Sequence, residues 1–96
     1  MNLTQQAGPE PHFALSDEEA QARAEEARKI RRLQLMISMV MSVVGQDPDL
    51  TYEQASELAA GAKRTALAMF PDKELAFDLL YKPRLQRLIR ERFRLQ

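Results

Sequence analysis

The stretch Leu33–Val44 reads LQLMISMVMSVV, and nine of its twelve residues are apolar while none is charged. In a helix, Gln34, Ser38 and Ser42 would form one narrow polar stripe, with apolar side chains on every other side. Neighbouring elements bury a helix of this kind, so we expect it to be the central element of a small all-α domain. Twelve helical residues cover only about 18 Å, which is too short to cross a membrane.

Upstream of this stretch, the pattern predicts that the same helix begins at Ser16. Ser16 and Glu19 have the spacing of a capping box, and three acidic residues follow the serine directly. The helix is expected to end near Gly45, a residue type typical of helix C-termini. Its charged N-terminal half should project beyond the core or pack on a second subunit. The predicted buried seam consists of Ile30, Leu33, Ile37, Val40 and Val44.

A second helix is predicted after the turn at residues 46–49, with Thr51 as its cap and Gln54 completing a capping box. Gly61 in its middle predicts a close approach to the large side chains of the first helix. Residues 50–65 partly resemble a helix-turn-helix motif, but Gly61 falls one residue later than the turn requires, so one continuous helix is expected. The predicted buried residues are Ala55, Leu58, Ala59, Ala62, Ala66, Met69 and Phe70.

The C-terminal third predicts two shorter helices, at residues 72–81 and 84–95, separated by a break or kink at Pro83. The predicted fold is therefore an all-α bundle of three to four helices, with a long N-terminal helix and a proline-kinked C-terminal pair. No stretch has the pattern of a β-strand. The first of these two helices is expected to bury Leu75, Ala76, Leu79 and Leu80. The second is expected to bury Leu85, Leu88, Ile89 and Phe93.

Composition predicts one helical domain at residues 16–96, preceded by a flexible tail at 1–15. The formal net charge is zero and there is no cysteine, which excludes disulfides and thiol chemistry and favours a cytoplasmic protein. The only histidine, His12, lies in the proline-flanked tail, where nothing would hold it for catalysis. We therefore predict no catalytic residue, no metal ligand and no cofactor, and a protein that is not an enzyme.

Two groups of residues are candidates for an interaction. The first is an apolar face beside the predicted seam, made of Leu35, Met36, Met39 and Val43. These side chains either pack in the core of one chain or bury against a second copy. A homodimer, or another protein partner, is the expected consequence of the second alternative.

The second candidate is the basic C-terminal helix. Residues 82–96 contain six basic residues and one acidic residue, whereas residues 45–81 carry a net charge of −4. The candidate contacts for an anion or nucleic acid are Lys82, Arg84, Arg87, Arg90 and Arg94. These cations either contact phosphates, contact an anionic membrane surface or acidic partner, or form a solvated face paired with the acidic regions. The sequence thus predicts a non-catalytic protein–protein interaction or oligomerisation module, with a small nucleic-acid-binding protein as the alternative.

Overall fold

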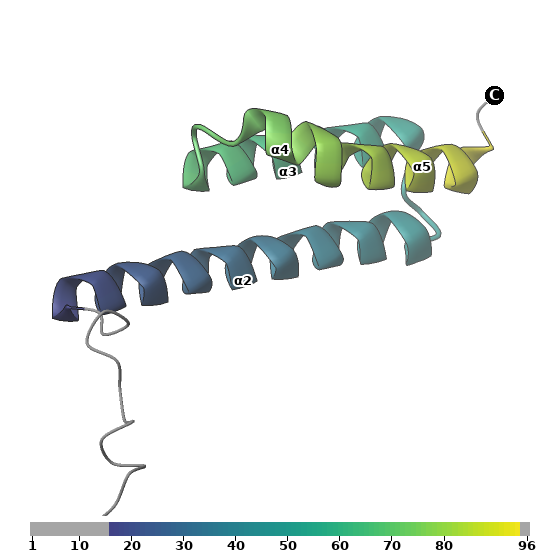
Figure 1. Ribbon diagram of the computed structural model, residues 1–96. Coiled ribbons are helices and arrows are strands. Elements are labelled where there is room, and N and C mark those ends of the chain that lie inside the picture. Colours follow the sequence, from purple (N-terminus) through teal and green to yellow (C-terminus); the bar gives the residue numbers. More distant parts are fainter. Residues whose placement is uncertain (1–15, 95–96) are drawn as a thin grey trace, which may run out of the picture.

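The computed structural model describes residues 16–94 and shows a bundle of four helices, which confirms the predicted all-α fold (Figure 1). The helices are α2 (Asp17–Gln46), α3 (Tyr52–Met69), α4 (Glu74–Leu80) and α5 (Lys82–Phe93). Helix α3 runs back along α2, and α4 and α5 then return in the direction of α2 (Figure 1). Helix α5 packs against both α2 and α3, so these three helices enclose the core.

Both predicted capping boxes are present. The Ser16 hydroxyl accepts the Glu19 N–H at 3.1 Å, and the Glu19 carboxylate accepts the Ser16 N–H at 2.9 Å. This backbone hydrogen bond from Ser16, with the serine hydroxyl as second contributor, lowers the pKa of Glu19 below its ordinary value. Thr51 and Gln54 make the same pair of bonds at the start of α3, at 3.1 and 3.0 Å. Each box satisfies N–H groups that the first turn of a helix leaves without partners.

The core consists of two adjoining apolar clusters. The first is centred on Leu33, Ile37 and Phe77, and the second on Val44 and Ile89. Only one stripe of α2 takes part, because Leu35 and Met39 are 62% and 60% exposed. The expectation that residues 33–44 are buried on nearly every side is therefore wrong. Helices α3 and α5 pack on one side of α2, and nothing in residues 16–94 covers its opposite side.

The N-terminal part of α2 projects past the rest of the bundle, as the charge pattern predicted (Figure 1). Residues 16–26 are all exposed. The buried seam of α2 begins at Leu33 rather than at the predicted Ile30, because Ile30 is 42% exposed. A helix of 30 residues is about 45 Å long, which exceeds the span of its shorter neighbours.

Helix α4 presents a different face to the core from the predicted one. Phe77 is buried at 5% exposure, whereas Leu75, Leu79 and Leu80 are 71%, 67% and 61% exposed. Apolar residues cover more than half of this helix's circumference, so their pattern alone does not determine which side turns inward. In this rotation α4 also forms two ion pairs with α3, because the ammonium of Lys63 lies 2.9 Å from Glu74 and 3.0 Å from Asp78. Burial of Phe77, worth about 1.5–3 kcal/mol, outweighs these partly exposed ion pairs, each worth at most about 1 kcal/mol.

Pro83 follows the predicted break between the C-terminal helices, since α4 ends at Leu80 and α5 begins at Lys82. It lies in the first turn of α5, where its missing N–H removes no helical hydrogen bond. The change of direction occurs at Tyr81, which still accepts the Leu85 N–H at 3.0 Å. Phe77, Leu85 and Ile89 consequently belong to one buried stripe, spaced by multiples of four residues across the joint. The predicted apolar side of α5 is confirmed, with Leu85 and Ile89 buried and Leu88 and Phe93 half-buried.

The end of α2 lies next to Gly45 as expected, but the structural roles predicted for Gly45 and Gly61 are both wrong. Helix α2 continues through Gly45 to Gln46 and ends at Asp47, which has extended rather than left-handed backbone. A Cβ atom on Gly61 would meet only the Arg64 side chain, at 3.4 Å, so no close approach to α2 occurs there. The tight contacts of α3 are made instead by its buried alanines, Ala55, Ala62 and Ala66.

Cations from neighbouring helices cap the C-termini of both long helices, which have no basic residue in their own last turns. Arg92 of α5 donates to the carbonyl oxygens of Val44 and Asp47 at the end of α2. Lys29 of α2 donates to the Met69 carbonyl at the end of α3, at 3.4 Å, and lies over the Phe70 ring. These contacts neutralise the negative ends of the two helix dipoles and also tie the helices together.

The predicted tail at residues 1–15, including His12, lies outside the described residues. Between residues 16 and 94, no helix has the length and apolar character needed to cross a membrane.

Candidate interaction surfaces

The outer face of α2 is formed by Leu35, Met39 and Val43, which are spaced four residues apart and lie along one side of the helix. Their exposed fractions are 62%, 60% and 40%. Ile37 and Met39 are two residues apart and so point about 200° away from each other, which places the outer face opposite the core stripe. Met36, the fourth residue of the predicted face, is half-buried and packs against the first core cluster. The outer face is thus a narrow apolar strip of three side chains.

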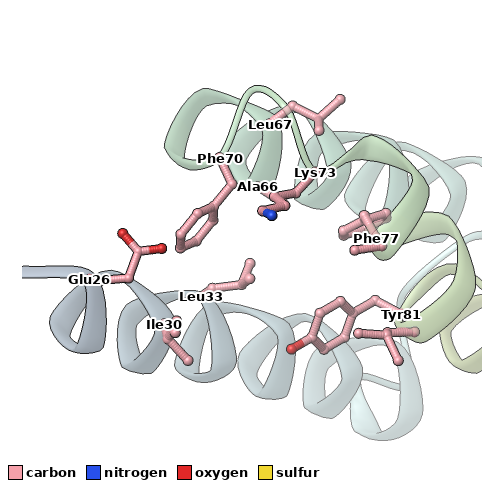
Figure 2. A pocket seen from close by; sticks show the side chains of 11 residues that line it. Glu26, Ile30, Leu33, Ala66, Leu67, Phe70, Lys73, Phe77 and Tyr81 are labelled. Carbon is pink, nitrogen blue, oxygen red and sulfur yellow. The ribbon is translucent and has the colours of Figure 1, made fainter. Parts of the chain in front are cut away.

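A second apolar surface, which sequence reasoning missed, lies where α4 faces the N-terminal half of α2. Figure 2 shows Phe70, Leu33 and Tyr81 around a groove of about 270 Å³ between these elements. Glu26 and Lys73 are the charged residues among those that line it. Leu80 belongs to the groove lining, and the exposed Leu75 and Leu79 lie on the same short helix. The sequence does contain an indication of this surface, because α4 has more apolar residues than one buried face can hold.

The basic face of α5 comprises the five candidate residues Lys82, Arg84, Arg87, Arg90 and Arg94, all of which are exposed. Arg87 lies two residues before the buried Ile89, so the two side chains point to opposite sides of the helix. Arg84 and Arg90 lie three residues before and after Arg87, and Arg94 lies four residues after Arg90, so that all of them share its outward side. None of these cations forms an ion pair with another residue in the range 16–94.

The acidic start of α2 cannot neutralise this basic face within one chain. Residues 17–26 lie at one end of the molecule, and α5 ends beside the C-terminus of α2 at the other (Figure 1). Arg92, although it adds to the same local charge, is half-buried and committed to the main-chain carbonyls of Val44 and Asp47. The sequence analysis left Arg92 out of the candidate contacts but did not identify the carbonyls that it binds.

Polar groups with catalytic potential are few in the described part of the chain. No group of three or more histidine, cysteine, aspartate or glutamate residues within 16–94 is arranged to hold a metal ion. The most connected polar group is Lys63, whose hydrogen bonds to Glu74 and then to Asp78 raise its pKa above the ordinary lysine value. This arrangement stabilises the α3–α4 packing below the ordinary lysine pKa, and the stabilisation is lost as the pH rises through the higher pKa of the folded state.

The relation of this chain to known proteins was tested in three ways. No protein-family model, no curated protein and no solved structure matches it.

Proposed function

We propose that this chain is a non-catalytic helical interaction module that forms a homodimer through the outer face of α2. The observation that carries the proposal is the exposure of Leu35 and Met39, at 62% and 60%, on the side of α2 opposite the core. Apolar side chains that gather along one helix face mark interaction sites more often than singly scattered ones do. The absence of cysteine suits a reducing compartment, so we place the module in the cytoplasm.

A second copy is the natural partner for this strip. In a two-fold contact, the same face serves both subunits, so three side chains in each chain become six in the interface. Methionine at the centre favours such a contact, because its flexible thioether adapts to the opposing surface. The strip lies on a helix of 30 residues that is capped at both ends, so it is held rigid before association.

The replacement Met39→Lys is expected to convert the dimer into a folded monomer. Its dimer dissociation constant should rise at least about 100-fold, because two ammonium groups would face each other in an apolar contact. Folding should persist, since Met39 is 60% exposed and makes no core contact. Sedimentation velocity measures the association, and far-ultraviolet circular dichroism checks the helix content of the same samples.

The matched control is Ala68→Lys, which adds the same charge at an exposed position of α3. This variant should sediment like the wild-type chain. A wild-type chain that stays monomeric at high micromolar concentration, or a Met39→Lys variant that still dimerises, would contradict the proposal.

The exposed basic face of α5 supports a second candidate function, binding of nucleic acid. Its cations lack carboxylate partners within residues 16–94, which leaves them available to phosphates. The double variant Arg87→Glu/Arg90→Glu should then abolish a salt-sensitive gel shift of DNA or RNA, because two attractive contacts become repulsive. Unchanged thermal stability would show that the variant is folded. If the wild-type chain shifts neither nucleic acid at low salt, this function is excluded.

A further inference from the structure

We infer that the two copies pair antiparallel along α2, with the two-fold axis at Met39. The inference rests on the proposed homodimer and specifies its geometry. Met39 is the midpoint of the outer face, so a two-fold contact centred there sets Met39 against its own copy. In this arrangement Leu35 lies against Val43 of the partner subunit, and the apolar strip is covered along its whole length. A parallel pair would instead set Leu35 against its own copy.

The charges at the two ends of the outer face favour the antiparallel arrangement. Its N-terminal end is flanked by the exposed cations Arg28, Arg31 and Arg32. At its C-terminal end, the chain carries the half-buried Asp47 and the exposed Asp49, whereas the Arg92 guanidinium at this end belongs to α5, on the core side of α2. An antiparallel pair brings the basic end of one strip over the acidic end of the other. In a parallel pair, like charges would meet at both ends, which opposes association.

The negative charge on the projecting part of α2 also favours antiparallel pairing. Residues 17–26 contain five acidic residues and one arginine, all of them exposed. In the antiparallel pair, the two acidic segments lie at opposite ends of the dimer and do not repel each other. A parallel pair would place the two acidic segments side by side. Because both effects act through solvent, they weaken as salt shortens the Debye length, which is about 10 Å at 0.1 M.

Disulfide crosslinking tests the direction of pairing cleanly, because the chain contains no cysteine. A Leu35→Cys chain is mixed with a Val43→Cys chain under mild oxidation, and the products are separated by intact mass. Antiparallel pairing should give the mixed disulfide in at least about tenfold excess over the Leu35→Cys homodisulfide. In that geometry the two copies of residue 35 are about 12 Å apart along the axis, beyond the roughly 4.4–6.8 Å that a disulfide allows between Cα atoms. An Ala68→Cys chain serves as the control and should not crosslink.

A double variant tests the direction of pairing independently, because it should change the dimer affinity in opposite directions for antiparallel and parallel pairs. Arg28→Gln/Arg32→Gln should weaken an antiparallel dimer about two- to fivefold, since it removes attractive contacts, but strengthen a parallel one. A dimer that forms chiefly the Leu35→Cys homodisulfide would overturn the antiparallel inference and leave the proposed homodimer intact. A chain that neither crosslinks at these positions nor dimerises in sedimentation would overturn both.

Discussion

Replacement of Phe77 with alanine is expected to lower the free energy of unfolding by about 3–5 kcal/mol. Phe77 is 5% exposed and packs in the core cluster with Leu33, Ile37 and Leu85. Its ring also lies 5.7 Å from that of Tyr81, an aromatic contact that the alanine would lose. A chain of this size is stable by only about 5–14 kcal/mol, so the loss is a large fraction of the total. Urea unfolding measures it as a lower midpoint at an unchanged slope.

The control is Leu79→Ala on the same helix. Leu79 is 67% exposed, so this variant should change the free energy of unfolding by less than about 1 kcal/mol. Both changes are best made in the Met39→Lys background, so that folding is measured apart from association. If Leu79→Ala proved more damaging than Phe77→Ala, α4 would be rotated to the face that its leucine spacing predicts.

Leu85→Ala is expected to cost about 2–5 kcal/mol of stability. At 2% exposure, Leu85 is one of the two largest fully buried side chains of residues 16–94. It joins α5 to the cluster that α2 and α3 supply, so its loss leaves a cavity among three helices. The backbone there has little freedom to collapse, because Arg92 holds α5 against the end of α2. Thermal unfolding should therefore show a clearly lower midpoint.

The matched control for Leu85 is Leu80→Ala, which removes the same atoms from a side chain that is 61% exposed. Leu80 lines the groove between α4 and α2, so this change should leave stability nearly unaltered. Equal losses in the two variants would mean that Leu80 is also covered in solution. That result would indicate an occupant of the groove.

The amino-acid sequence alone determined which stretches are helical and how α2 and α3 begin. Both capping boxes, the continuous α3 and the apolar side of α5 are local features, since they depend on residues within a few positions of one another. The same spacing set Leu35, Met36, Met39 and Val43 apart from the core seam, although Met36 in fact packs against the core. The exposure of the other three within residues 16–94 was not determined by the sequence. It depends on how many helices pack against α2.

Tertiary contacts decided which faces point inward and which cations remain exposed. The leucines of α4 are solvated because Phe77 packs in the core, and in the same rotation Lys63 of α3 pairs with Glu74 and Asp78. Arg92 caps α2 because α5 returns along it, a contact between residues 48 positions apart. Periodicity shows which residues share a side of a helix. In a helix with a wide apolar arc, however, several different rotations would bury apolar side chains. The helix therefore adopts the rotation at which distant partners satisfy its charged and apolar groups together.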